Sequence, residues 1–343
     1  MQCDLQAIPL GKQWSGKEKL RGADKFIFYT PSSGVWQSVW LEAVPEVSVE
    51  RLVITPDLDN SRLKLKIVTE SKEEEADVEV LEGDEVIIKK TLTTNGDHHV
   101  DLGDNVKEWS PDSPFLYDLQ ITLRSGDHVR SYFGMRKIEM RKVGKFQRIF
   151  LNNKELKFQL GPLDQGYWPD GILTPPTEEA LKWDLQEIKR LGFNMVRKHI
   201  KVESARWYYW TDRMGLLVWQ DFPSISDVHN TGGISAEFRD NFAVEYTRWM
   251  EQRGNQPSII LWVVFNEAWG QFDTVEVTKD VMARDPSRLV TCASGWDDFP
   301  VGNITDLHVY PGPSNGGSKG RFKGKLKLIF QSQKENRTVM PVP

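Results

Sequence analysis

The stretch at residues 258–272, SIILWVVFNEAWGQF, decides how this sequence folds. Residues 259–265 are all apolar, so a strand here is expected to be buried on both of its faces. Asn266 and Glu267 follow at once, so the strand ends in an amide and a carboxylate. Doubly buried strands are typical of parallel sheets that helices cover, and the polar pair then lies at the carboxyl edge of the sheet.

The sequence around this stretch, from about residue 148 onward, alternates between helix and strand patterns. Thr177 precedes a run with apolar residues at helical spacing that Gly192 ends, and Gly215 ends a second helix pattern. The strands between the helices are nearly continuously apolar, which predicts parallel strands. Each expected strand is followed by polar or aromatic residues, which are Asp164, Tyr167 and Trp168; Arg197 and His199; Gln220 and Asp221; Asn266 and Glu267; Trp296 and Asp297; His308 and Tyr310.

These strand ends favour a TIM (β/α)8 barrel. All strand ends of such a barrel converge on one face, where active sites are built. An open doubly wound sheet gathers ligands at a single switch point instead. Because every strand contributes a polar end and no G-x-G-x-x-G or P-loop motif occurs, the barrel is the better interpretation.

The sequence before the barrel has a different hydropathy pattern. Between about residues 47 and 142, short runs alternate apolar and polar residues, and Gly83 and Gly126 stand in expected hairpin turns. This pattern predicts an antiparallel β-sandwich of immunoglobulin-like size. We therefore expect a multidomain β plus α/β protein with an incomplete domain at 1–45, a sandwich at 46–142, a partial barrel at 143–313 and a separate basic tail at 314–343.

The composition of the sequence narrows the classes of molecule that the protein is expected to bind. The net charge of −5 gives no basis for binding nucleic acid or an anionic membrane. No apolar run approaches the ~20 residues that span a bilayer. Residues 1–14 show no apolar leader, so the sequence as written predicts a cytoplasmic protein, although it leaves the compartment open. The two cysteines, Cys3 and Cys292, do not form a disulfide framework.

The polar strand ends point to sugar chemistry. The sequence has 13 tryptophans, and sugar-binding proteins often lay aromatic rings against pyranose faces. A retaining glycosidase uses two carboxyl groups about 5 Å apart, one as acid/base and one as nucleophile. Neither a phosphate-binding loop nor a histidine-rich zinc ligand set is visible. We expect a carbohydrate partner and no cofactor or metal.

Seven segments, in order across roughly residues 27–313, resemble glycoside hydrolase family 2, which includes β-galactosidases, β-glucuronidases and β-mannosidases. They are YTPSSGVWQSVWLE, WSPDSPFLYDLQITL, FGMRKIEM, LGFNMVRKH, GLLVWQDFPS, IILWVVFNE and DLHVYPGP. The family layout is a jelly-roll sugar-binding domain, an immunoglobulin-like sandwich and a catalytic barrel. The resemblance implies that residues 1–45 are the remnant of the jelly roll.

The resemblance also implies roles for single residues. Glu267 is the general acid/base, with a helix-dipole contact as the alternative role, and Asn266 binds the sugar 2-hydroxyl. Arg197 steadies the nucleophile or forms a structural ion pair. Further substrate-binding candidates, each with a plain packing role as the alternative, are His199, Asp221, His308, Tyr310, Trp168 and Trp296.

The resemblance stops before the family's nucleophile, a glutamate on the seventh strand. Residues 314–343 contain one acidic residue, Glu335, in a basic context that does not match the family motif. We therefore expect no nucleophile in this sequence and impaired hydrolysis, and we expect the tail to be solvated, non-family sequence or the product of a shifted reading frame. The alternatives to a β-galactoside or β-glucuronide hydrolase are a non-catalytic carbohydrate-binding protein and an inactive gene fragment. Open barrel edges make a homo-oligomer possible.

Overall fold

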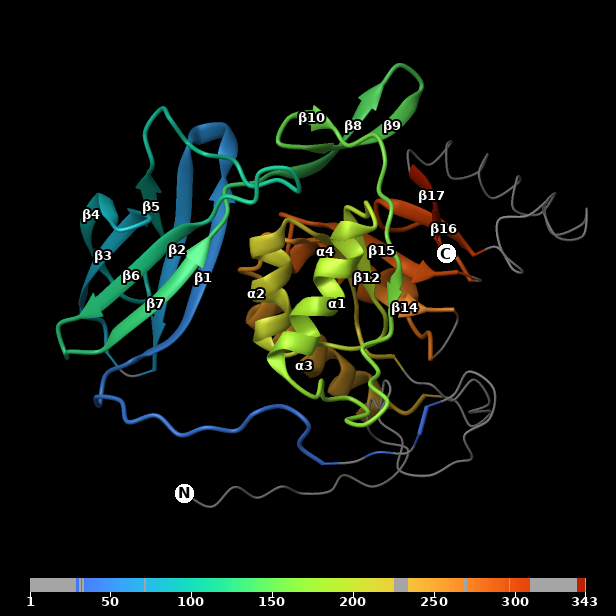
Figure 1. The fold of residues 1–343 in the computed structure, drawn as a ribbon, viewed down its shortest axis with the longest axis horizontal. Coiled ribbons are helices and arrows are strands. Elements are labelled where there is room, and N and C mark those ends of the chain that lie inside the picture. Colours follow the sequence, from blue (N-terminus) through green and yellow to red (C-terminus); the bar gives the residue numbers. More distant parts are fainter. Residues whose placement is uncertain are drawn as a thin grey trace, which may run out of the picture.

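The computed structural model describes residues 29–30, 32, 34–70, 72–224, 234–267, 270–295, 297–308 and 338–342. Figure 1 shows a β-sandwich on one side, a parallel sheet with four helices on the other side, and a small antiparallel sheet above the parallel sheet. The predicted combination of an immunoglobulin-like sandwich and an incomplete TIM barrel is confirmed.

The sandwich packs two antiparallel sheets around one apolar core. Alternate residues of each strand point inward, as at Leu63, Leu65 and Ile67, which are all buried. Gly83 and Gly126 have positive φ angles in hairpin turns, as predicted. One sheet has the order β1 (Val49–Asp57), β2 (Arg62–Thr69) and β5 (His98–Asp101), with the 3-10 turn η1 (Leu58–Asn60) between β1 and β2. The other has the order β4 (Glu85–Thr93), β3 (Glu75–Glu82), β6 (Tyr117–Leu123) and β7 (His128–Phe133).

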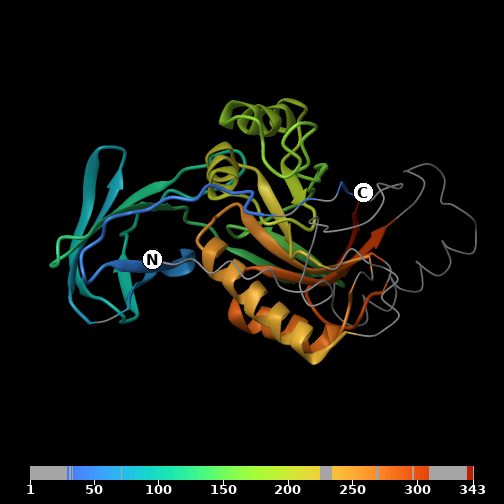
Figure 2. The same ribbon diagram turned by 90° about the horizontal axis from the view of Figure 1, so that it is seen from below.

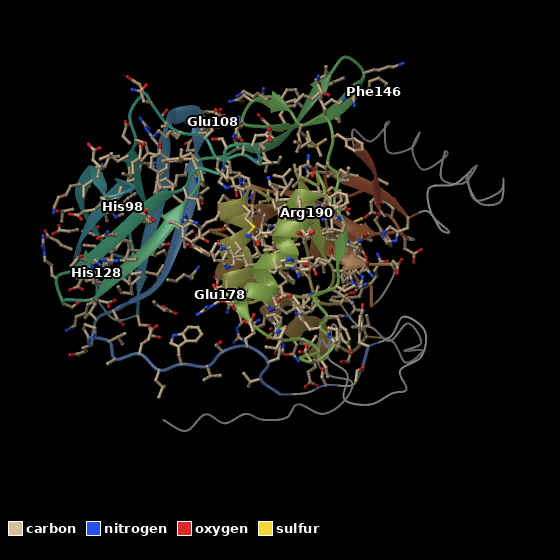
Figure 3. All side chains as sticks on the ribbon, viewed as in Figure 1. His98, Glu108, His128, Phe146, Glu178 and Arg190 are labelled. Atoms are coloured by element: carbon tan, nitrogen blue, oxygen red, sulfur yellow. The ribbon has the colours of Figure 1, made fainter. Side chains whose placement is uncertain are left out.

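A separate three-stranded sheet follows the sandwich. Strand β8 (Ile138–Val143) pairs with β9 (Phe146–Leu151), and β10 (Lys154–Glu155) pairs with β9. Figure 3 shows Phe146 at the outer end of this hairpin, on the opposite side of the molecule from His98 and His128 in the sandwich. The boundary expected between residues 142 and 143 therefore runs through one hairpin.

The third part is a seven-stranded parallel sheet in which neighbours in sequence are neighbours in space. Figure 2 shows the helices on the outside of this curved sheet, which is not closed into a ring. The strands are β11 (Leu163–Asp164), β12 (Met195–Lys198), β13 (Leu217–Asp221), β14 (Ile259–Asn266), β15 (Leu289–Ser294), β16 (Ile304–His308) and β17 (Thr338–Val342). The helices are α1 (Glu178–Arg190), α2 (Ala205–Met214), α3 (Ala236–Arg253) and α4 (Thr274–Arg284).

Strand β17 lies in the region that the sequence analysis expects to be a solvated tail. Its backbone pairs in parallel with β16 from Thr338 to Val342. The short run TVMPV is mostly apolar, and the basic residues before it dominated the composition on which the expectation was based. Glu335 and the other tail residues at 309–337 lie outside the described residues.

Local signals position the helices as the sequence predicts. The Thr177 hydroxyl accepts a hydrogen bond from the backbone N–H of Ala180 at 3.1 Å and caps α1. Leu181, Leu185 and Ile188 bury one face of α1. Gly215 takes the left-handed conformation at the end of α2, with φ 68°.

Side chains from the sandwich and from the linker after it bind the helix α2 and the segments where β14 and β15 begin. Trp109 is fully buried, and its Nε1 donates to the carbonyl of Asp212 at 2.8 Å. Arg136 is also buried, and it donates to the carbonyls of Pro257, Ile259 and Ser287 at 3.1, 2.9 and 2.8 Å. The Trp109 bond fixes the sandwich to α2, and the Arg136 bonds fix the linker after the sandwich to the end of β14 that lies opposite Glu267.

Asp212 is a buried carboxylate at this contact. It accepts from the backbone N–H of Ser258 at 2.9 Å and from the hydroxyl of Tyr132, a sandwich residue, at 2.8 Å. Burial raises the pKa of Asp212 from 3.8 to about 7, and the hydrogen bonds from Ser258 and Tyr132 oppose part of that rise.

Asp212→Asn is expected to flatten the dependence of stability on pH. Because the folded pKa is raised, the stability contributed by protonated Asp212 is complete below about pH 4 and is lost as the pH rises through 7. Asparagine cannot ionise, so the variant should gain stability over the wild type between pH 4 and 8, by at most about 4 kcal/mol. Urea unfolding at several pH values measures this, and a difference that does not change with pH would contradict it.

Candidate active site

Four strands of the parallel sheet bring polar side chains together at their carboxyl ends. Arg197 is the last residue but one of β12, and Asp221, Asn266 and His308 end β13, β14 and β16. All four are buried, with exposed fractions between 0 and 7%. The sequence analysis names all four, and the structure places them in one connected cluster.

Arg197 is the centre of this cluster. Its Nε and Nη2 donate to Oδ1 and Oδ2 of Asp221 at 2.9 and 2.7 Å, a bidentate pair. Burial alone would lower the pKa of Arg197, but the Asp221 carboxylate outweighs burial and the net pKa is raised. The Arg197 guanidinium therefore stays ionised inside the barrel. Arg197 thus forms the ion pair that the sequence analysis gave as its alternative role.

Arg197 also orients Asn266. Its Nη2 donates to Oδ1 of Asn266 at 2.7 Å. A guanidinium has no acceptor, so the amide oxygen faces Arg197 and the Nδ2 amide group faces away from it. Nδ2 is buried and meets no acceptor among the residues that the structure describes. A buried N–H group of this kind favours a ligand with an acceptor oxygen.

Glu267 is the first residue after β14, and its backbone has a φ of 44°. Its N–H donates to the carbonyl of Ser294 at 2.6 Å, which holds this left-handed conformation in place. For a residue with a Cβ this conformation is strained, and such strain clusters at functional sites. The turn carries the Glu267 side chain to the cluster, where Oε1 lies 2.9 Å from Nδ1 of His308. Its side chain is 12% exposed.

His308 connects Glu267 to the rest of the cluster. Its Nε2 lies 2.8 Å from Oγ of Ser294 and 3.5 Å from Nη1 of Arg197. Its ring packs directly against Gly295, where a Cβ atom would come within 2.8 Å of Nδ1. Gly295 has a φ of 100°, so both its conformation and this close approach require glycine.

Asp306 lies two residues before His308 on the same face of β16. Its Oδ1 accepts from the backbone N–H of Gly295 at 2.5 Å, and it is buried. Burial raises the pKa of Asp306 to about 6, while the positive charge of Arg197 opposes part of that rise. The sequence analysis did not select Asp306 or Ser294, although the alternation with His308 along one strand could have revealed Asp306.

His199 lies in a neighbouring group that includes the N-terminal segment. Its Nδ1 is 2.9 Å from Oε1 of Gln165, which also accepts from the Tyr29 hydroxyl at 2.8 Å. Burial raises the pKa of Tyr29, and the charges of Asp221 and Glu267 raise it further. These electrostatic effects place Tyr29 near the carboxylates of the cluster. Tyr29 and Gln165 were missed as site residues, although Tyr29 begins a segment on which the family resemblance rests.

A second set of buried charges, also missed, lies beside the first two strands. Lys198 contacts Asp164 and Glu203 at 2.6 and 3.1 Å, and Lys201 contacts Glu203 at 2.7 Å. Burial lowers the pKa of Lys198, but Asp164 and Glu203 outweigh it and the net pKa is raised. Asp164, Lys198 and Glu203 border a hollow of about 670 Å³ between β11 and α1, which is also lined by Trp168, Trp183 and Trp207 among other residues.

Of the remaining substrate-binding candidates, the structure describes Trp168 but not Trp296 or Tyr310. Trp168 lines that hollow and pairs through its backbone with Ile172, so its role as a sugar platform stays a prediction. Trp296 and Tyr310 lie outside the described residues. Among the residues described, no group of three or more His, Cys, Asp or Glu side chains is placed to hold a metal ion. No helix in the described ranges is long and apolar enough to cross a membrane.

Comparison with known proteins gives consistent matches. Curated relatives include a β-galactosidase of Clostridium acetobutylicum, 26% identical over 75% of this chain and 31% of its own length. A putative β-glucuronidase of Formosa agariphila is 26% identical over 91% of this chain and 39% of its own length. A solved β-glucuronidase from Ruminococcus gnavus in complex with D-glucaro 1,5-lactone has a TM-score of 0.71 at 21% identity, over 87% of this chain and 54% of that one.

The chain spans about a third or less of the length of the first curated relatives that it matches. Residues 47–136 match the family described as "Glycosyl hydrolases family 2", which corresponds to the sandwich. Residues 147–310 match "Glycosyl hydrolases family 2, TIM barrel domain", which carries the cluster around Glu267. These two matches cover both main parts of the fold, and the chain belongs to glycosyl hydrolase family 2.

Proposed function

We propose that this chain binds a terminal β-linked sugar at the Arg197–Asn266–Glu267–His308 cluster, with Glu267 as the general acid/base of a retaining glycosidase site. The observation that carries the proposal is the buried Nδ2 group of Asn266, next in sequence to a carboxylate held in a strained turn. A β-galactoside or a β-glucuronide is the proposed substrate, supported by the names of the relatives.

The geometry around Asn266 fits a sugar hydroxyl. Arg197 fixes the amide so that Nδ2 can donate to an acceptor on the ligand, and the sugar 2-hydroxyl provides such an acceptor. Hydrogen bonds to this hydroxyl strengthen as positive charge develops on the ring in the transition state. Asn266 would thus add to the rate as well as to binding.

Glu267 would act twice in the reaction. It first donates its proton to the glycosidic oxygen as the bond from that oxygen to the anomeric carbon breaks, while a second carboxylate forms the glycosyl–enzyme bond. It then removes a proton from the water that attacks the anomeric carbon and releases the carboxylate. No residue of this chain is assigned as the second carboxylate, and the sequence-based expectation of impaired hydrolysis stays a prediction.

Two measurements separate hydrolysis from simple binding. Calorimetry with D-galactono-1,5-lactone and with D-glucaro-1,5-lactone tests binding and the choice of sugar. Titration of buffer without lactone is the blank. Hydrolysis of p-nitrophenyl β-galactoside and β-glucuronide tests turnover. Asn266→Ala should weaken lactone binding about tenfold or more, because it removes a hydrogen bond inside a buried site. Asn60→Ala, in an exposed turn of the sandwich, is the control.

The outcomes decide between the candidate functions. Hydrolysis of one glycoside together with weaker binding in Asn266→Ala would support the full proposal. Lactone binding without turnover would instead favour the carbohydrate-binding alternative. If neither lactone binds and neither glycoside is cleaved, the proposal is wrong.

A further inference from the structure

Two described residues that the proposed mechanism does not use, Ser294 and Asp306, lie directly behind the histidine that contacts Glu267. Ser294 ends β15, and both its hydroxyl and its carbonyl contact residues of the cluster. The carbonyl accepts from the N–H of Glu267 and the hydroxyl contacts Nε2 of His308. One residue therefore touches the backbone of the proposed acid/base and the imidazole that contacts its carboxylate.

The charges around His308 decide which ring nitrogen carries its proton. Arg197 directs Nη1 at Nε2 from 3.5 Å, the outer limit of a hydrogen bond, and its positive charge disfavours a proton on that nitrogen. On the other side of the ring, Nδ1 lies 2.9 Å from Oε1 of Glu267. While Glu267 is ionised, its carboxylate has no proton to donate, so the hydrogen of this contact then sits on Nδ1. Both neighbours favour the same neutral tautomer.

We propose that Ser294 is a positioning residue that locks His308 in the Nδ1–H tautomer by donating its hydroxyl proton to Nε2. His308 then donates to Oε1 of Glu267 and so directs the acid proton of Glu267 to Oε2. This step rests on the proposed acid/base role of Glu267. It explains how a single carboxylate oxygen would deliver and collect the proton in both halves of the reaction.

One competing arrangement has to be considered. Ser294 could instead donate its single hydroxyl proton to Asp306, whose pKa a hydrogen bond from Ser294 lowers, and accept from an Nε2–H group. In that arrangement the Nε2–H group of His308 would face the N–H groups of the Arg197 guanidinium. On the other side of the ring, the lone pair of Nδ1 would face a lone pair of Oε1 of Glu267. Among the described residues, four charged or polar groups face His308: Arg197 from β12, Glu267 after β14, Ser294 from β15 and Asp306 from β16. Of these, Arg197 and Glu267 oppose the alternative arrangement.

The tautomer can be measured without a substrate. The chain contains six histidines, so selective ¹⁵N labelling gives few signals, and His308→Gln assigns the one that matters. Long-range ¹H–¹⁵N correlation at pH 7 should show His308 with a protonated Nδ1 and an unprotonated Nε2. Ser294→Ala should shift the population toward Nε2–H. Ser294→Thr, which keeps the hydroxyl, and Asp306→Asn, which replaces the competing carboxylate with a weaker neutral acceptor, should keep the wild-type pattern.

Wild-type His308 in the Nε2–H or doubly protonated form would overturn the inference, and this outcome does not depend on whether any variant folds. An unchanged pattern in Ser294→Ala, or a lost pattern in Asp306→Asn, would also overturn it. If glycosides are neither bound nor cleaved while the tautomers behave as expected, the proposed function fails and the role of Ser294 in fixing His308 remains. The two failures are therefore distinguishable.

Discussion

Glu267→Gln is expected to lower the rate of β-glycoside hydrolysis by about 10²- to 10⁴-fold, the usual contribution of a general acid/base. Glutamine has nearly the same shape but cannot transfer a proton. Its Oε1 can still accept from Nδ1 of His308, so the fold and lactone binding should change little. The measurement is the initial rate on p-nitrophenyl glycosides, with the melting temperature of both proteins as the check on folding.

The leaving group provides the matched control for this prediction. A 2,4-dinitrophenolate leaves without help from an acid, so the loss on its glycoside should be smaller than on a phenyl glycoside. An equal loss on both substrates would show that Glu267 does not act as the acid. Unchanged rates on both would contradict any role of Glu267 in proton transfer.

Arg197→Met is expected to reduce the free energy of unfolding by about 3–5 kcal/mol, because it leaves the Asp221 carboxylate buried without its partner. It should also reduce sugar binding, since Asn266 loses the donor that fixes its amide. Urea unfolding and lactone calorimetry measure the two effects separately.

Adding Asp221→Asn to Arg197→Met should recover part of the lost stability, since a neutral amide replaces the orphaned charge. Sugar binding should not recover, because the contact between Arg197 and Asn266 is still absent. If the stability losses of the two single variants simply add in the double variant, the ion pair does not act as a unit. That result would contradict this account of the cluster.

Much of the fold could be predicted because local patterns in the sequence determine it. The Thr177 cap, the Gly215 helix end and the fully apolar β14 each depend on a few neighbouring residues. Strand β17 could not be predicted, because its pairing with β16 joins backbones across a long stretch of sequence that carries a different composition. Pairing of that kind leaves no mark in local periodicity.

For the candidate site, too, the residues marked by a local sequence pattern could be predicted and those defined by distant contacts could not. Arg197, Asn266, Glu267 and His308 stand at strand ends, where a barrel brings side chains together whatever their distance in sequence. Ser294 was missed because a serine that ends an apolar strand has no local signal. Its importance comes from a ring on β16 and a turn after β14. Lys198 was missed because its carboxylate partner Asp164 comes from a separate strand.

Strand β14 is held at both ends by groups from different parts of the chain. Arg136, a residue of the linker after the sandwich, binds the carbonyls where β14 begins, and Ser294 binds the N–H of Glu267 where it ends. The barrel thus relies on a neighbouring domain for hydrogen bonds at its base. Anyone who trims this protein to its barrel, in order to graft or redesign it, would have to supply new donors for those carbonyls. Without them, the trimmed protein should lose rigidity in the strand that positions its acid.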